Sequence, residues 1–257
     1  MSDGYTTPSG LMVQRQGKGA PVVYVHGLGG TSAVWEPQIL ALRDSYSCIH
    51  FDLRGSGSSA ADLPLSIEHW VDDLAEIMDE SGVEHASVIG HSLGSLIAQH
   101  FACSQPHRVD KLALLGVNRS PPDERRAAIL QRAQEVRRNG MASIIDGLLQ
   151  TALAETTRRD KPTVVAAVRE MIESQDRFAY ARSCEAMAAS TRPNLNSFDA
   201  PVLLVAGLDD PVSPPSISKQ FADEIGAKLE LLPDCGHWMP LEQPQRLNRI
   251  LADFLRD

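Results

Sequence analysis

Cysteine is scarce in this chain, and its few cysteines show no pattern. The 257 residues contain four, without a C-x-x-C pair or any spacing typical of metal ligands. We therefore expect neither a disulfide framework nor a metal centre, but reduced and mostly buried thiols. The four are Cys48, Cys103, Cys184 and Cys235.

Long apolar runs and an excess of positive charge are also missing. No stretch approaches the roughly 18 apolar residues of a membrane span, and the N-terminal MSDGYTTPSG lacks the apolar core of a secretory signal. A formal net charge of −9 gives no basic surface for nucleic acid and disfavours anionic membranes. These absences predict a cytoplasmic protein without nucleic-acid or membrane partners. They leave its oligomeric state open, a homo-oligomer included.

The chain does contain a regular alternation of short apolar runs with amphipathic stretches. The runs VVYV, SVIG and LALLG lack polar alternation, which is typical of strands buried on both faces of a parallel sheet. The pattern predicts the α/β class, with a doubly wound, mostly parallel sheet. Strands are expected at 21–25, 46–51, 86–89, 111–115, 201–206 and 229–232, with a leading edge strand at 11–14, and helices at 32–43, 67–80, 92–103, 213–225 and 243–256.

The alternation stops at residues 121–193, which show only helical patterns rich in Ala, Arg and Glu. A helical block inserted into such a sheet is most simply a lid over the carboxyl ends of the strands. Open α/β folds bind their ligands at that edge. The predicted organisation is therefore a core formed by residues 1–120 and 194–257, with a helical lid insertion at 121–193.

Residues 90–94 read G-H-S-L-G, between an apolar run and a helical pattern. In this strand–turn–helix setting the flanking glycines let strand and helix approach closely, and the serine adopts a strained conformation that exposes its hydroxyl. The helix N-terminus that follows favours an oxyanion through its free N–H groups and dipole. We therefore predict that Ser92 is a nucleophile.

A serine nucleophile needs a base and an acid that orients the base. His237 lies in a glycine-supported loop after the strand 229–232 and is the predicted base, because the other histidines occupy helices, a strand or solvent-facing positions. The acid is expected after the strand 201–206, where Asp209 and Asp210 are adjacent. Neighbours on an extended loop point in opposite directions, so only one can face His237, and spacing does not choose between them.

The nucleophile also needs two backbone N–H groups as an oxyanion hole. Leu93 is expected to supply one, and Leu28, in the glycine-rich loop 26–30, the other. This loop lacks the G-x-G-x-x-G and G-K-[ST] patterns, so we do not expect it to bind nucleotides. We expect His26 to anchor this loop. For Trp35 and Trp238, packing in the core is the alternative role. The predicted substrate-pocket residues are His26, Gly27, Trp35 and Trp238.

The segments HGLGG, GHSLG, GLDDPVSP and GHW, in this order, resemble the α/β-hydrolase superfamily over nearly the whole chain. FDLRGSGSS at 51–59 resembles the D-x-R-G-x-G-x-S segment beside the active site of these proteins. The resemblance implies the α/β-hydrolase fold and selects Asp210 as the acid, since it follows Gly207 by three residues and precedes Pro214 by four. A serine nucleophile in place of aspartate argues against haloalkane dehalogenases and epoxide hydrolases.

Within the superfamily, AGLDDPVSPP and RRNGMASIIDGLL resemble 3-oxoadipate enol-lactonases. These enzymes hydrolyse a small carboxylate-bearing enol-lactone in aromatic catabolism, without a cofactor. The elbow GHSLGS departs from the GLSMGG-like form of many members, and its His91 and Ser95 also occur in general esterases. The resemblance implies hydrolysis of a small carboxylic ester or lactone, with 3-oxoadipate enol-lactone as the candidate, through an acyl-enzyme on Ser92.

A substrate with a second carboxylate would require an arginine from the helical block, because a guanidinium binds a carboxylate bidentately. The sequence does not select one. Candidates include Arg125, Arg126, Arg132, Arg137, Arg138, Arg158 and Arg159.

Other activities would use the same three residues and are left open by the sequence. They are hydrolysis of a C–C bond in a meta-cleavage product, hydrolysis of an acyl-homoserine lactone in a longer apolar pocket, and perhydrolysis with peroxide in place of water. A non-catalytic ligand-binding protein on the same fold is a more distant alternative.

Overall fold

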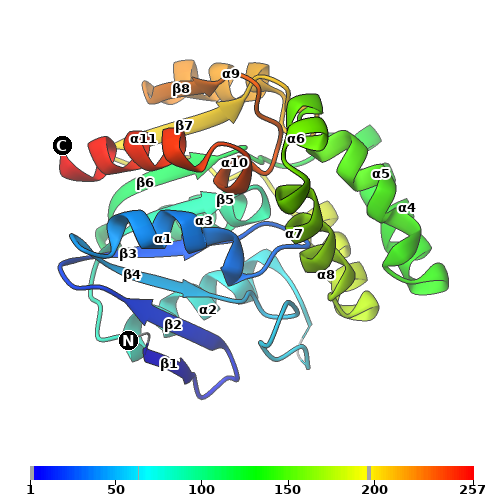
Figure 1. Cartoon of the computed structure of the whole chain (residues 1–257). Helices are drawn as coiled ribbons and strands as arrows, with labels where there is room; N and C mark the ends of the chain where they lie inside the picture. Colours follow the sequence, from blue (N-terminus) through cyan, green and yellow to red (C-terminus); the bar gives the residue numbers. More distant parts are fainter. Residues whose placement is uncertain (1–2, 63, 196–197) are drawn as a thin grey trace.

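A single twisted sheet forms the centre of the computed structural model, which describes residues 3–62, 64–195 and 198–257. Within these residues the sheet has eight strands in the order β1-β2-β4-β3-β5-β6-β7-β8 (Figure 1). From β4 to β8 all neighbours are parallel, whereas β2 is antiparallel to both of its neighbours. The strands are β1 (Asp3–Thr6), β2 (Met12–Gln16), β3 (Ala20–Val25), β4 (Tyr46–Phe51), β5 (Ala86–His91), β6 (Val109–Leu115), β7 (Val202–Gly207) and β8 (Lys228–Leu232).

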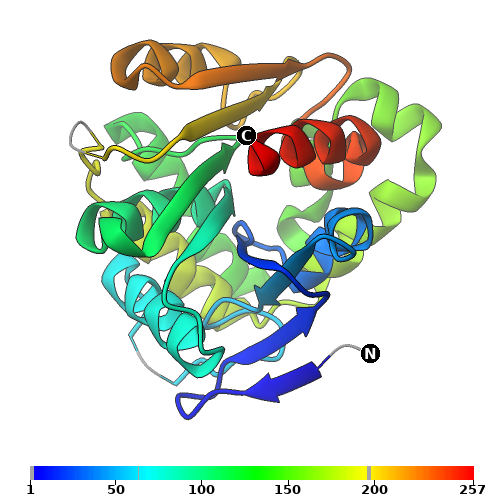
Figure 2. The same cartoon turned by 90° about the vertical axis from the view of Figure 1, so that its left-hand side faces the viewer.

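Helices cover both faces of the sheet, which is why its inner strands are apolar along most of their length. Figures 1 and 2 show helices packed on either side of the strands. Every residue of β5, in the middle of the sheet, is buried. The first face carries α1 (Glu36–Leu42) and α11 (Pro244–Arg256), and the second carries α2 (Ile67–Glu80), α3 (Leu93–Ser104) and α9 (Pro215–Ile225). This arrangement confirms the predicted fold class.

A helical insertion separates β6 from β7 and lies at one end of the sheet, on the right in Figure 1. Its helix α8 begins at a side-chain cap, where Asp176 accepts the N–H groups of Phe178 and Ala179 at 3.0 and 2.8 Å. The insertion consists of α4 (Asp123–Asn139), α5 (Ala142–Ala152), α6 (Glu155–Asp160), α7 (Pro162–Glu173) and α8 (Arg177–Ala189). No helix in the described part of the chain is long and apolar enough to cross a membrane.

The structure corrects the prediction at the N-terminal edge of the sheet. Residues 11–14 were expected to form an edge strand, but the corresponding strand β2 is internal and β1 forms the edge. The short sequence DGYT of β1 carries no apolar alternation, and its place is decided by pairing with β2. Residues 1, 2, 63, 196 and 197 of the predicted domain ranges lie outside the described residues.

The predicted helix at 32–43 is divided in two, whereas the predicted helix at 243–256 agrees with α11 to within one residue. The stretch 32–43 divides into a 3-10 helix, η1 (Ser32–Trp35), and α1. The stretch 243–256 is preceded by α10 (Met239–Glu242) and a break at Gln243. Pro37 and Pro244 stand at the beginnings of α1 and α11, where the missing N–H of proline costs no helical hydrogen bond.

Candidate active site

Ser92 lies in the sharp turn that joins β5 to α3. Its backbone has φ +53° and ψ −115°, a conformation that costs a non-glycine residue about 1–3 kcal/mol. The turn is tight because α3 begins against β3: a Cβ on Gly94 would lie 2.1 Å from the main-chain oxygen of Val25. The Ser92 N–H donates to the Leu115 carbonyl at 2.9 Å. The serine is thereby fixed at the carboxyl edge of the sheet.

His237 and Asp210 follow the neighbouring strands β8 and β7 and are hydrogen-bonded. The His237 Nδ1 atom lies 2.8 Å from Asp210 Oδ2. The other carboxylate oxygen accepts the N–H groups of Val212 and Ser213 at 2.8 and 2.9 Å. Because an ionised carboxylate only accepts hydrogen bonds, Nδ1 carries a proton, and the tautomer that this bond favours has its lone pair on Nε2.

The two adjacent aspartates of this loop have different surroundings. Asp210 is 2% exposed, whereas Asp209 is exposed and donates its N–H to the Cys235 carbonyl at 2.9 Å. Burial raises the pKa of Asp210, but the electrostatic interaction with His237 and the hydrogen bonds to the carboxylate lower it by more, so the pKa lies below its ordinary value. Asp210 is therefore the ionised neighbour of His237, a choice that spacing left undecided.

Ser92 and His237 line the same cavity, which has a volume of about 120 Å³. Within the described residues, neither the Ser92 hydroxyl nor His237 Nε2 has a hydrogen-bond partner. Hydrogen bonds between such groups commonly tighten only when substrate binds. The helical insertion supplies most of the cavity wall. The other lining residues are Leu28, Asn118, Arg125, Ala128, Ile129, Arg132, Leu148, Thr151, Ala152, Ile172, Tyr180, Met187, Val212 and Trp238.

The two N–H groups predicted to bind an oxyanion belong to Leu28 and Leu93. Leu93 is the first residue of α3, so its N–H has no acceptor within the helix. Leu28 lines the cavity, and its N–H has no acceptor in the described part of the chain. The Asp52 carboxylate supports this loop by accepting the N–H groups of Ser32 and Ser58 at 2.8 and 2.9 Å. The N–H groups of Leu28 and Leu93 thus have no main-chain acceptor in the described residues, although of the two residues only Leu28 lines the cavity.

Comparison with known proteins assigns this arrangement to a family. The alpha/beta hydrolase fold family matches residues 20–244. The chain belongs to the alpha/beta hydrolase fold family. The resemblance drawn from HGLGG, GHSLG, GLDDPVSP and GHW is therefore confirmed.

Several members of the family are similar to this chain over nearly their whole length. The 3-oxoadipate enol-lactonase 2 of Acinetobacter baylyi is 29% identical over 238 residues, 91% of this chain and 88% of the relative. The enol-lactonase structure from Burkholderia xenovorans LB400 has a TM-score of 0.93 and 25% identity, and the match covers 99% of this chain and 100% of that one. The malate-bound thermophilic esterase from Thermogutta terrifontis has a TM-score of 0.91 and 29% identity, with coverage of 100% and 98%.

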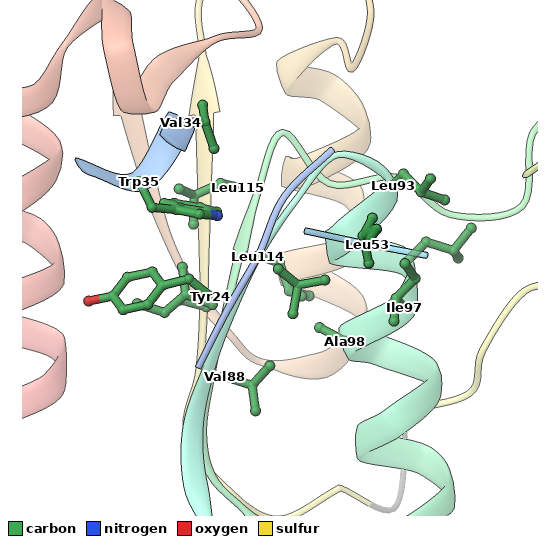
Figure 3. Close-up of a cluster of buried hydrophobic side chains, with 14 of the residues drawn as sticks. Tyr24, Val34, Trp35, Leu53, Val88, Leu93, Ile97, Ala98, Leu114 and Leu115 are labelled. Carbon is green, nitrogen blue, oxygen red and sulfur yellow. The ribbon is translucent and has the colours of Figure 1, made fainter. Parts of the chain in front are cut away.

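Of the residues predicted to form the pocket of this hydrolase-fold protein, Trp238 lines the cavity and Trp35 does not. Trp35 is fully buried in the core, with its ring centroid 5.3 Å from that of Tyr24 (Figure 3). The Trp35 ring also lies edge-on to the His91 ring, with 6.5 Å between the ring centroids. The prediction is corrected accordingly: Trp35 supports the site from the core, the alternative that its sequence context already allowed.

His26 and Gly27 are likewise absent from the cavity wall among the described residues. The His26 ring bonds the Gly27 carbonyl through Nδ1 at 2.8 Å and accepts the Leu53 N–H through Nε2 at 2.9 Å. Burial lowers the pKa of His26, which favours this neutral form. With both ring nitrogens hydrogen-bonded to main-chain groups, His26 is not placed to act as a base.

Among the seven candidate arginines, the structure brings Arg125 and Arg132 into the cavity wall. Neither forms an ion pair with a carboxylate in the described residues. Burial lowers the pKa of Arg125, the charge of Asp210 opposes this effect, and the charge of Arg132 adds to it. The remaining five have other surroundings: Arg126, Arg137 and Arg159 pair with Asp123, Glu185 and Asp160, Arg158 bonds the Gln150 and Leu153 carbonyls, and Arg138 is exposed.

Asn118 and Tyr180 also line the cavity, although sequence reasoning did not identify them. The Asn118 main chain is held from both sides, by Ser95 Oγ at 2.9 Å and by the Gln99 amide at 2.8 Å. Tyr180 lies beside Arg132, whose charge acts on its hydroxyl. No motif marks either residue. Their place follows from where α8 and the loop after β6 meet the elbow.

His91, which precedes the elbow serine, is a buried neighbour of His237. Its Nε2–H donates to the main-chain carbonyl of His237 at 2.7 Å, and the two rings lie 4.9 Å apart. Nδ1 has no hydrogen-bond partner among the described residues. Burial and the nearby His237 lower the pKa of His91 to about 3. His91 therefore stays neutral near pH 7 and holds the main chain of the His237 loop against the sheet.

We expect His91 to make the stability of the protein depend on pH below neutrality. An unfolded histidine takes up a proton near pH 6.5, whereas folded His91 does so only near pH 3. Between these two pH values the unfolded state binds more protons than the folded state. The unfolding free energy therefore falls with falling pH, by up to roughly 1.4 kcal/mol per pH unit. In His91→Asn, the loss of unfolding free energy between pH 7 and pH 5 should shrink by up to about 2 kcal/mol in urea titrations.

Val88→Ala is the matched control, because it truncates a core side chain without removing a titratable group. It should lower the unfolding free energy by a similar amount at both pH values. If His91→Asn keeps the pH dependence of the unsubstituted protein, His91 does not titrate differently in the folded and unfolded states.

Proposed function

We propose that this protein is a serine hydrolase that cleaves small carboxylic esters or lactones through an acyl-enzyme on Ser92. The observation that carries the proposal is the convergence of a strained elbow serine and the Asp210–His237 pair on one cavity. The family and its similar members, named as enol-lactonases and an esterase, support the hydrolytic activity.

In the first half of the proposed reaction, the Ser92 oxygen attacks the carbonyl carbon of the substrate while His237 Nε2 takes the hydroxyl proton. Asp210 holds His237 in the tautomer with a free Nε2 lone pair and stabilises the imidazolium that forms. The N–H groups of Leu28 and Leu93 donate to the oxyanion. The tetrahedral intermediate collapses as the C–O bond breaks, and the imidazolium protonates the departing oxygen.

In the second half, water attacks the acyl carbon and His237 Nε2 accepts a proton from it. The second tetrahedral intermediate releases the carboxylic acid, and the proton returns to the Ser92 oxygen. Ser92, His237 and Leu28 line the cavity, Asp210 bonds His237, and Leu93 directly follows the nucleophile.

For the substrate class, we propose an ester or lactone that carries a carboxylate, bound by Arg125 with Arg132 nearby. Two guanidiniums that line a cavity without an acidic partner in the described residues offer a counter-charge for an anion. The Acinetobacter baylyi relative is named for 3-oxoadipate enol-lactone, and the Thermogutta terrifontis esterase binds the dicarboxylate malate. We propose 3-oxoadipate enol-lactone, and with it a role in aromatic catabolism, as the first candidate.

The size of the cavity favours a small substrate over a long acyl chain. Its volume of about 120 Å³ is below the ~300–1,000 Å³ that drug-sized ligands occupy. This volume supports a short acyl group more than a long-chain acyl-homoserine lactone. We further propose that the helical insertion at 121–193 acts as the lid, since it carries both arginines and supplies most of the cavity wall.

Substitution of Ser92 by Ala tests the mechanism directly. We expect the rate of 4-nitrophenyl acetate hydrolysis to fall by ~10⁴-fold or more, because the acyl-enzyme cannot form. A fluorophosphonate should label the unsubstituted protein at Ser92, seen by peptide mass spectrometry, and should leave Ser92→Ala unlabelled. An unchanged circular dichroism spectrum is the control for folding. Hydrolysis by Ser92→Ala at the original rate would refute the mechanism.

The adjacent aspartates provide a matched pair for the role of the acid. Asp210→Asn should lower kcat by about 10³–10⁴-fold, since the amide can no longer hold His237 in the required tautomer. Asp209→Asn makes the same chemical change at an exposed position and should stay within a few-fold of the original kcat. Steady-state rates with one ester measure both variants. Equal losses, or a larger loss in Asp209→Asn, would contradict the assignment.

The carboxylate specificity is tested with two esters of equal chain length, mono-4-nitrophenyl succinate and 4-nitrophenyl butyrate. Arg125→Met should raise KM for the charged succinate ester by roughly 10–100-fold, because a charge-assisted hydrogen bond is lost. It should change KM for the uncharged butyrate ester little. Arg126→Met is the control, because Arg126 pairs with Asp123 away from the cavity. Equal effects on the two esters would show that Arg125 does not bind the carboxylate.

A further inference from the structure

Glu242, the last residue of α10, carries a carboxylate that is completely buried. Its two oxygens accept backbone N–H groups: Oε1 that of Trp238 at 3.0 Å and Oε2 that of Ala154 at 2.9 Å. Lys161 donates to the main-chain carbonyl of Glu242, and no ion pair to the carboxylate is formed within the described residues. Burial raises the pKa of Glu242, and the N–H donors oppose that effect by stabilising the ionised form.

The two donors belong to segments far apart in the sequence. Trp238 directly follows His237, whereas Ala154 lies at the junction of α5 and α6 in the helical insertion. At this junction the Ala152 carbonyl also accepts the N–H of His237 at 2.8 Å. A Cβ on Gly236 would lie 2.6 Å from the Ala154 nitrogen, so only glycine lets the two segments approach this closely.

We propose that Glu242 is a positioning residue that fastens the His237 loop to the α5–α6 junction, so that the histidine and the insertion are held as one unit. The catalytic effect of Glu242 rests on the proposed function, whereas the contact that Glu242 makes between the two segments does not. An ionised carboxylate suits this place because both of its oxygens accept, whereas the amide of glutamine would accept with only one. Loss of either bond leaves a buried polar group unpaired.

The junction offers a second variant that breaks the same contact from the other side. Ala154 has φ −57° and ψ 149°, and the preceding Leu153 is extended, with φ −107° and ψ 140°. Proline requires a φ of about −65° and an extended residue before it, and Ala154 and Leu153 meet these two conditions. Ala154→Pro therefore removes the N–H donor to Glu242 while keeping the main-chain path. Glu155→Gln, at the next residue, is the matched control for a changed carboxylate that faces solvent.

The first measurement is amide hydrogen exchange followed by mass spectrometry on the whole protein. In Glu242→Gln, peptides covering 152–156 and 236–242 should both exchange at least ~10-fold faster, with the strands of the sheet unchanged. Ala154→Pro should speed exchange in 236–242 although the substitution lies in the insertion. Glu155→Gln should match the unsubstituted protein. If exchange in 236–242 is unchanged in both test variants, the segments are not fastened by Glu242 and the inference is overturned.

The second measurement separates positioning of His237 from general stability. With 4-nitrophenyl acetate, which carries no carboxylate for Arg125, kcat should fall by ~10–100-fold in Glu242→Gln and Ala154→Pro, with KM within about threefold. A KM effect without a kcat effect, or kcat equal to that of Glu155→Gln, would overturn the positioning role. If the unsubstituted protein neither hydrolyses the ester nor reacts with a fluorophosphonate, the proposed function fails, while hydrogen exchange still decides whether Glu242 fastens the two segments.

Discussion

The close contact of α3 with β3 is the constraint on which the rest of the site depends. At Gly94 there is no room for a side chain against the Val25 carbonyl, and this contact holds Ser92 at a positive φ. A strained serine persists only where surrounding packing fixes it, and here the buried strands on either side of the elbow do so. Because α3 starts at the next residue, the same contact also leaves the Leu93 N–H without a helical acceptor and beside the serine.

The position of His237 depends on two other parts of the molecule at once. His91 holds its carbonyl from the sheet, and Ala152 accepts its N–H from the helical insertion. The ring is then oriented by Asp210, whose second oxygen is itself fixed by two backbone N–H groups. The insertion therefore contributes more than residues of the cavity wall. It provides part of the framework for the histidine, together with the buried Glu242, and it supplies both arginines of the wall.

The parts of the fold that the sequence predicted best are those whose apolar residues follow a clear strand or helix pattern. The strand expected at 46–51 and the helix expected at 67–80 coincide with β4 and α2, because the strand is buried on both faces and the helix has a serine cap and a regular apolar face. The edge strand β1 escaped prediction because its four residues carry no period of their own. In the site, the tight turns and loops could be predicted because glycines and motif residues identify them. Asn118, Tyr180 and Glu242 line or support the site but belong to no motif that sequence reasoning used.

The sequence by itself determined the strand–helix alternation, the elbow around Ser92 and the chain order that brings serine, aspartate and histidine to one sheet edge. These features rest on local chemistry: apolar periodicity, glycine in a tight turn, and the parallel strands that such patterns build. Only the tertiary structure decided that Trp35 lies in the core and that Arg125 and Arg132 line the cavity. It also contains the hydrogen bond from His237 to Asp210, the aspartate that the resemblance selected and that spacing alone did not. Side-chain direction at these positions depends on which distant element packs against each residue, and the local sequence does not determine that contact.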